Sequence, residues 1–135
     1  MKLAIRYFTK SKKGNTEKLA NVVSKALNLE ALDVSKDLEE NVEKLILINA
    51  MYATDIDKEV KEFLERNKDK IGEVINMNTS ASGSSTIKAV KKVTDKLQMK
   101  LSDKEFHCAA SWIFINKGLP SEDDYKKAEE FVLSL

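Results

Sequence analysis

Hydroxyl and amide side chains gather in one short segment near the start of the chain, YFTKSKKGNTEKLA, residues 7–20. Thr9, Ser11 and Thr16 carry hydroxyl groups, and Asn15 carries an amide. If a helix begins here, the free backbone N–H groups of its first turn join these side chains, and the helix dipole favours an anion. The segment therefore predicts a phosphate-binding loop, although a simple helix cap at Asn15 or Thr16 explains the same residues equally well.

Two further loops hold residues that suit a flat or polar ligand. Met51 and Tyr52 lie in residues 50–55, and both side chains are suited to covering a flat ring. Residues 79–85 read TSASGSS, and such small residues let the backbone approach a ligand closely. The alternatives are an ordinary surface loop with Met51 in the core, and a flexible loop that ends in a helix cap.

The pattern of apolar residues indicates how these loops are positioned. It predicts strands at residues 2–8, 29–34, 44–49, 73–78 and 105–115 and helices at 16–28, 57–66, 86–97 and after Ser121, with at most a turn or two of helix in 35–43. This alternation predicts an α/β fold of three layers, a doubly wound parallel sheet with helices on both faces. Ligands of such folds bind beyond the carboxyl ends of the strands, which brings residues 9–15, 50–56 and 79–85 together.

Composition bounds the class of protein. The chain has 135 residues, which predicts a single domain over residues 1–135. Its net charge of +1 argues against a partner such as nucleic acid or an anionic membrane surface. The one cysteine, Cys108, excludes an internal disulfide and a multi-cysteine metal site, and we expect no metal. No stretch approaches the roughly 20 apolar residues of a membrane span, so we expect a cytoplasmic protein.

The same segments resemble flavodoxins over the whole chain. YFTKSKKGNTEKLA is similar to the flavodoxin phosphate-binding loop, roughly Ser/Thr-x-Ser/Thr-Gly-Asn-Thr after the first strand. ILINAMYATDID, INMNTSASGSS and KGLPSEDDYKKAEEFV resemble the loops after the third and fourth strands and the closing segment of that family. The resemblance implies a five-stranded parallel sheet of order 2-1-3-4-5, the short-chain form, with FMN as the cofactor at the point where the strand order reverses.

The resemblance also assigns the cofactor-binding residues. It implies that the FMN phosphate is held by Thr9, Lys10, Ser11, Gly14, Asn15 and Thr16, that Met51, Tyr52 and Ala53 form the loop beside the flavin ring, and that Thr79, Ser80, Ala81, Ser82 and Gly83 contact the ribityl chain and the pyrimidine edge. Lys12 and Lys13 depart from the pattern as a two-residue insertion, so loop geometry decides whether FMN binds.

These residues predict an FMN-binding, flavodoxin-like electron-transfer protein whose partner is a redox protein or a small-molecule acceptor. No side chain stands out as a catalytic nucleophile or base. His107 and Cys108 are adjacent in a strand and point to opposite faces, so we expect structural roles for both. The near-neutral charge weakens electrostatic steering of a partner, which keeps a flavin-dependent reductase of a small molecule as one alternative. A flavin-free binding module with the same fold is the other.

Overall fold

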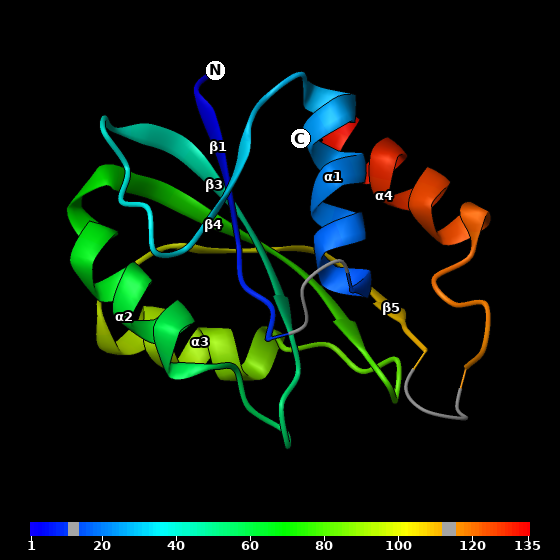
Figure 1. The fold of residues 1–135 in the computed structure, drawn as a ribbon. Helices are drawn as coiled ribbons and strands as arrows, with labels where there is room; N and C mark the ends of the chain where they lie inside the picture. Colours follow the sequence, from blue (N-terminus) through cyan, green and yellow to red (C-terminus); the bar gives the residue numbers. More distant parts are fainter. Residues whose placement is uncertain (11–13, 112–115) are drawn as a thin grey trace.

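The strands form one sheet in which every neighbouring pair is parallel. The computed structural model describes residues 1–10, 14–111 and 116–135 (Figure 1). The strands are β1 (Leu3–Tyr7), β2 (Ala31–Asp33), β3 (Val42–Ala50), β4 (Ile71–Ser80) and β5 (Leu101–Ala109). Their order across the sheet is β2-β1-β3-β4-β5, which confirms the predicted order 2-1-3-4-5.

The helices cover both faces of this sheet (Figure 1). Helices α1 (Asn15–Leu27) and α4 (Glu122–Leu133) pack on one face, and α2 (Lys58–Asn67) and α3 (Ile87–Lys96) pack on the other. A short 3-10 helix, Lys68–Lys70, follows α2. The predicted three-layer architecture is therefore confirmed. Within the described part of the chain, no helix combines the length and apolarity needed to cross a membrane.

The central strand β3 divides the core into two halves. Leu45 and Leu47 face α2 and α3, whereas Ile46 and Ile48 face α1 and α4. All four side chains are fully buried. A parallel strand covered on both faces needs apolar residues at every position, and this explains the unbroken run LILI in the sequence.

Side-chain caps fix where α2 and α4 begin. The Asp57 carboxylate accepts a hydrogen bond from the backbone N–H of Glu59 at 2.9 Å. Ser121 and Asp124 form a capping box, in which each side chain accepts a hydrogen bond from the backbone N–H of the other. The predicted cap at Ser121 is thereby confirmed.

The last strand differs from its predicted range of residues 105–115. β5 begins at Leu101 and ends at Ala109. The backbone N–H of Ala110 still donates to the Ser80 carbonyl, but that of Ser111 donates to Leu119, which leads the chain away from the sheet. An apolar run does not by itself fix where strand pairing ends, and β5 is an edge strand that also contains exposed polar residues such as Asp103 and Lys104. The part of the prediction that covers residues 112–115 lies outside the described residues.

Residues 35–43, for which the sequence allowed at most a turn or two of helix, contain no helix. Turns and bends occupy residues 34–41, and β3 already begins at Val42. Leu38 is nevertheless buried and packs with Val34 and Val42 on the α2 side of the sheet. An irregular segment, and not a helix, therefore packs beside Ala4 of β1 on this face of the sheet.

Candidate functional site

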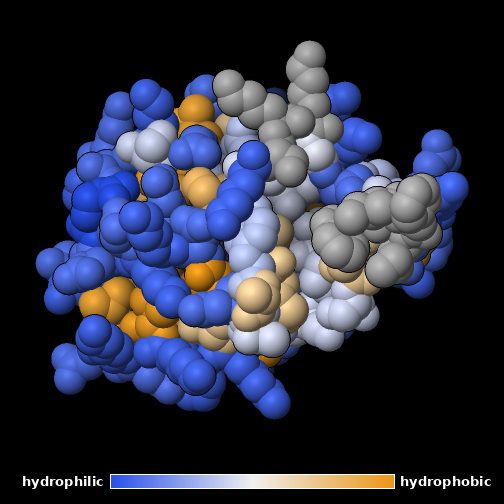
Figure 2. All heavy atoms as spheres, turned by 60° about the horizontal axis from the view of Figure 1, so that its bottom comes forward, coloured by the Kyte–Doolittle hydropathy of each residue, from blue (hydrophilic) through white to orange (hydrophobic). Residues whose placement is uncertain are grey.

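Four segments surround a hollow at the carboxyl edge of the sheet. The hollow has a volume of about 580 Å³ and is bordered by the loops after β1, β3, β4 and β5. Figure 2 turns this edge forward and shows a strip of near-neutral hydropathy between strongly hydrophilic surfaces. A hollow of this size suits a small ligand or cofactor.

The structure brings most of the sequence-predicted residues to this hollow. Those that border it are Thr9, Gly14, Asn15, Thr16, Met51, Tyr52, Ala53, Thr79, Ser80 and Ala81. Lys10, Ser82 and Gly83 are close in sequence but are not among the bordering residues. Ser11 and the Lys12-Lys13 insertion lie outside the described residues.

The start of α1 provides the donors for an anion. Gly14 is the N-cap, and it has no side chain with which to satisfy the first-turn N–H groups. Asn15 and Thr16 do not cap the helix, because the Asn15 amide donates to Ser111 Oγ at 3.1 Å and the Thr16 and Thr79 hydroxyls share a hydrogen bond of 2.9 Å. These two side chains instead join the first loop to the segment after β5 and to β4.

The loop after β3 is a tight turn with built-in strain. The backbone N–H groups of Tyr52 and Asp55 each donate to the carbonyl of the other, at 2.7 and 3.0 Å. Between them, Ala53 and Thr54 have φ angles of 49° and 72°, a left-handed conformation that costs roughly 1–2 kcal/mol for a residue with a side chain. Such strain clusters at ligand-binding segments.

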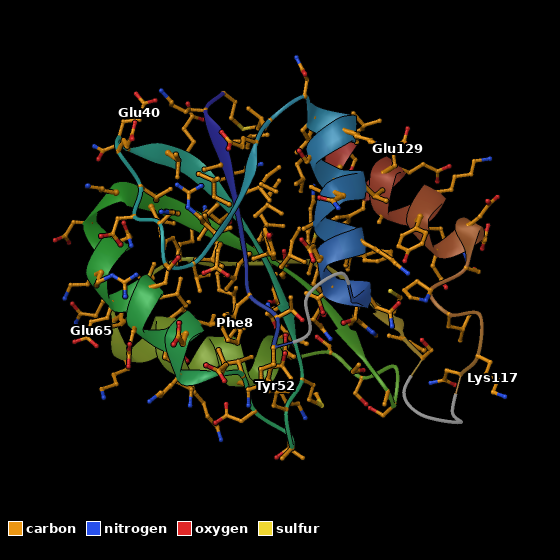
Figure 3. The ribbon with its side chains drawn as sticks, viewed as in Figure 1. Phe8, Glu40, Tyr52, Glu65, Lys117 and Glu129 are labelled. Atoms are coloured by element: carbon orange, nitrogen blue, oxygen red, sulfur yellow. The ribbon has the colours of Figure 1, made fainter. Side chains whose placement is uncertain are left out.

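Tyr52 is held in place by the first loop. Its hydroxyl accepts a hydrogen bond from the backbone N–H of Lys10 at 3.0 Å. The Lys10 ammonium lies 4.5 Å from the centre of the Tyr52 ring and 3.4 Å from Asp57 Oδ2. Figure 3 shows Tyr52 at the carboxyl edge, near the end of β1. Lys10 therefore contributes to the site by positioning the aromatic ring.

The loop after β4 is fastened from the β5 side. The carbonyl of Gly83 lies 2.7 Å from Nδ1 of His107, and the carbonyl of Ala81 accepts from the Asn116 amide at 2.5 Å. Ser82 Oγ donates to Ser84 Oγ at 2.9 Å. Ser82 and Gly83 thus hold the loop in shape, and the residues beside the hollow are Thr79, Ser80 and Ala81.

Three bordering residues were not assigned to the site from the sequence: Ala50, which lies inside the predicted loop 50–56, and Ala110 and Ser111, which lie outside the predicted loops. Ala50 is the last residue of β3, one position before the predicted Met51. Ala110 and Ser111 were placed inside a strand that ends earlier, at Ala109. The rule that ligands bind beyond the carboxyl ends of strands would have found them if the end of β5 had been placed correctly.

The expected structural roles of His107 and Cys108 agree with their contacts. His107 is exposed and bonds the Gly83 carbonyl, whereas Cys108 is buried. Burial, assisted by the Asp124 carboxylate, raises the pKa of the Cys108 thiol to about 11. A thiol with that pKa is a poor nucleophile. Among the described residues, no cluster of His, Cys, Asp and Glu could hold a metal ion.

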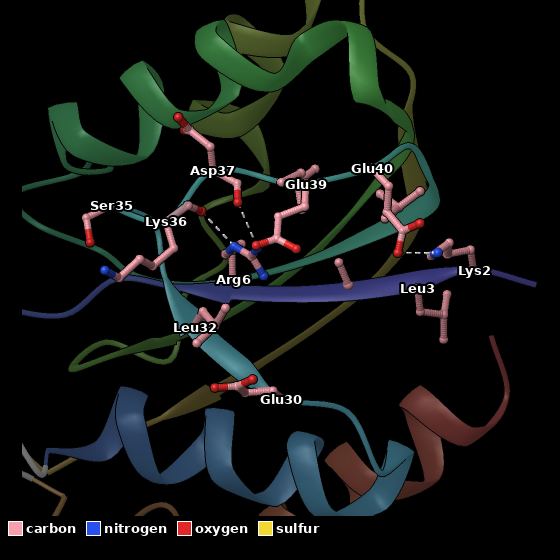
Figure 4. Close-up of a pocket in the computed structure, with 13 residues that line it drawn as sticks. Lys2, Leu3, Arg6, Glu30, Leu32, Ser35, Lys36, Asp37, Glu39 and Glu40 are labelled. Atoms are coloured by element: carbon pink, nitrogen blue, oxygen red, sulfur yellow. Dashed lines mark hydrogen bonds and ion pairs between the residues drawn. The ribbon is translucent and has the colours of Figure 1, made fainter.

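A second hollow, of about 490 Å³, lies beside β1 and the irregular segment before β3 (Figure 4). Its centre is the Arg6 guanidinium, which donates to the carbonyls of Ile5, Lys36 and Asp37 at 2.8–3.2 Å. Burial lowers the pKa of this guanidinium, and the carboxylates of Glu30, Asp37 and Glu39 oppose that effect. Arg6 therefore fastens the irregular segment before β3, and we assign this hollow a structural role.

Comparisons with known proteins agree with this geometry. A family model described as a flavodoxin domain matches residues 7–111. An uncharacterized protein of Methanocaldococcus jannaschii is 29% identical over 136 residues, which cover 90% of this chain and 89% of the relative.

Two solved structures share the fold. A flavodoxin from the domain Archaea has a TM-score of 0.75 at 11% identity, with 99% of this chain and 95% of that chain covered. The flavodoxin of Fusobacterium nucleatum bound to flavin mononucleotide has a TM-score of 0.68 at 17% identity, with 99% and 96% covered. Because the family model spans most of the sequence and the strand order is the same, the chain belongs to the flavodoxin family.

Proposed function

We propose that this protein binds FMN non-covalently at the carboxyl edge of the sheet and transfers electrons. The observation that supports the proposal is that the first turn of α1, whose N-cap Gly14 has no side chain, borders one hollow together with the loops after β3, β4 and β5. The family membership and the FMN bound to the Fusobacterium nucleatum flavodoxin support it.

The groups that border the hollow fit the three parts of FMN. The phosphate suits the first turn of α1, where backbone N–H groups, the Thr9 hydroxyl and the helix dipole favour an anion. The flavin ring suits the side of Met51 and Tyr52, which offer a flat or adaptable apolar surface. The ribityl chain suits Thr79, Ser80 and Ala81, whose backbone and hydroxyl groups border the remaining wall.

The flavin supplies the redox chemistry when it is bound, and the protein supplies binding, orientation and the local field. Asn15 holds the segment after β5 against the first loop through its bond to Ser111. Lys10 holds the Tyr52 ring through its backbone N–H and its ammonium group. Thr16 joins α1 to β4 through Thr79. These bonds prepare the walls of the site before a ligand arrives, which lowers the entropic cost of binding.

A fluorescence titration tests the proposal. We expect apoprotein to quench FMN fluorescence with one site per chain, and the Asn15→Ala/Thr16→Ala double variant to bind FMN at least about tenfold more weakly, a loss of about 1.4 kcal/mol. Asn21→Ala is the matched control, because Asn21 is an exposed asparagine of the same helix away from its first turn. Unchanged FMN affinity in the double variant would refute the role of these two side chains in holding the walls of the site in place.

Two alternatives are separated by simple observations on the purified protein. A small-molecule reductase would bleach its bound flavin on addition of NAD(P)H and turn over without a second protein, whereas an electron carrier requires a partner reductase. A flavin-free binding module would be colourless and would fail to take up added FMN. We further propose that the protein functions in the cytoplasm.

A further inference from the structure

Asparagine is unusually placed in the middle of this sheet. Asn49 in β3, Asn76 and Asn78 in β4 and Thr86 at the start of α3 are each at most 1% exposed. Asparagine is depleted in strands, and a buried amide is costly unless all its hydrogen bonds are made. Polar residues that work against both tendencies, of which Asn49 and Asn78 are next in sequence to residues that border a candidate site, need a reason beyond packing.

Three of these side chains form a closed ring of hydrogen bonds. The Asn49 amide donates to Asn76 Oδ1 at 2.8 Å, and the Asn76 amide donates to Thr86 Oγ1 at 3.0 Å. The Thr86 hydroxyl completes the ring by donating to Asn49 Oδ1 at 2.7 Å. The ring joins β3, β4 and the first residue of the segment that becomes α3. Fully satisfied buried networks of this kind are rigid and specify one arrangement.

Asn78 connects this ring of hydrogen bonds to the loop after β4. It pairs with Asn49 in the sheet register, so it lies directly beside the ring. Its amide donates to the Ser84 carbonyl at 2.9 Å, and its Oδ1 accepts from the Thr86 backbone N–H at 3.0 Å. Ser80 Oγ donates to the same Ser84 carbonyl at 2.9 Å. The end of the loop, at Ser84 and Thr86, is therefore hydrogen-bonded to the end of β4, where the loop begins.

We propose that Asn78 is a positioning residue for the cofactor site, an inference that rests on the proposed function. It does not border the hollow, but its bonds to Ser84 and Thr86 fix the loop that starts at Ala81, and Ala81 borders the hollow beside Thr79 and Ser80 at the end of β4. A loop of small hydroxyl residues has many alternative conformations, and ordering it during binding would weaken affinity. Asn78 removes this cost in advance for the flavin and ribityl parts of the ligand, which FMN shares with riboflavin.

The test compares two buried asparagines that bond backbone groups. Asn67 is 2% exposed, accepts from the Leu38 N–H at 2.9 Å and donates to the Phe63 carbonyl at 2.9 Å, remote from the hollow. Asn78→Ala and Asn67→Ala are each titrated with FMN and with riboflavin, and their stabilities are measured in urea. We expect both variants to lose stability, but only Asn78→Ala to lose affinity, by at least about fivefold and by the same factor for both flavins.

The circular dichroism of the bound flavin adds a readout that stability alone does not move. We expect its visible bands to change in Asn78→Ala and to stay unchanged in Asn67→Ala. If Asn78→Ala does not fold, Asn78→Ser is measured in the same way. If the wild-type protein binds flavin and an Asn78 variant binds it with the same affinity and the same visible circular dichroism, the positioning role of Asn78 is wrong but the proposed function is unaffected. A wild-type protein that binds neither flavin would overturn the proposed function, and this inference with it.

Discussion

At the scale of single residues, the role of each polar side chain at the site depends on the hydrogen bonds that it already makes within the protein. Asn15 and Thr16 resemble helix caps in the sequence, yet their side chains bond Ser111 and Thr79. Tyr52 resembles a free aromatic, yet its hydroxyl accepts from Lys10. Residue type indicated where the site lies, but it could not reveal these partners, because each is at least 40 positions away in the chain.

Cys108 provides a test at this scale. Because its pKa is raised to about 11, almost none of the thiol is ionised at pH 8 in the folded protein. We expect a thiol reagent to label the native protein at least about 100-fold more slowly than the protein unfolded in urea, where the pKa returns to about 8.5. Labelling at the same rate in both states would show that the thiol is neither buried nor perturbed.

The same shift has a consequence for stability with a definite sign. The pKa of the Cys108 thiol is raised by burial to about 11 in the folded protein, so ionisation favours the unfolded chain. The stabilisation is complete below the unfolded pKa of about 8.5 and is lost as the pH rises towards about 11. Cys108→Ala should remove this part of the alkaline decline, and urea unfolding at pH 8 and pH 10 would measure it.

At the scale of elements, α3 departs from the other helices in its charges. The first turns of α1, α2 and α4 contain acidic residues, whereas that of α3 contains none and carries Lys88. A positive charge near the N-terminus opposes the helix dipole. Lys91 and Lys92 lie one turn further along, at spacings where like charges repel.

We therefore expect Lys88→Glu to stabilise the protein by about 0.5–1.5 kcal/mol, since it complements the dipole and creates favourable pairs with Lys91 and Lys92. Urea unfolding at low and high salt measures the effect, which should shrink as salt screens it. Lys88→Gln is the control that removes the repulsion without adding attraction, and its gain should be smaller. A gain that is independent of salt would contradict the electrostatic explanation.

The elements also show where sequence patterns succeed and fail. The run LILI in β3 and the cap at Ser121 are local signals, and both predicted their elements correctly. The end of β5 and the absence of a helix in residues 35–43 depend on distant partners. Arg6 fastens the latter segment through the carbonyls of Lys36 and Asp37, 30 and 31 positions away. No local pattern records such a contact.

At the scale of the whole molecule, the order of the strands determines which loops meet. The alternation of strands and helices was enough to predict the sheet and to bring the loops after β1, β3 and β4 to one edge. The buried ring of Asn49, Asn76 and Thr86 was not predictable, because these residues become neighbours only through the pairing of β3 with β4. The fold was therefore more accessible from sequence than the details of the site.

The whole molecule also offers two hollows that compete as ligand sites, one at the carboxyl edge and one around Arg6. Arg6 already donates to three carbonyls and is surrounded by Glu30, Asp37 and Glu39, so an anionic ligand would meet repulsion there. The first turn of α1 offers donors and a favourable dipole instead. An FMN phosphate should therefore select the carboxyl edge.

A crystal structure of the protein grown with saturating FMN tests this choice most directly. We expect the phosphate at the first turn of α1, within hydrogen-bond reach of its backbone N–H groups and of Thr9, and the flavin ring beside Tyr52. Flavin bound in the Arg6 hollow, or a carboxyl edge that contains no flavin at saturating FMN, would contradict the proposed cofactor site.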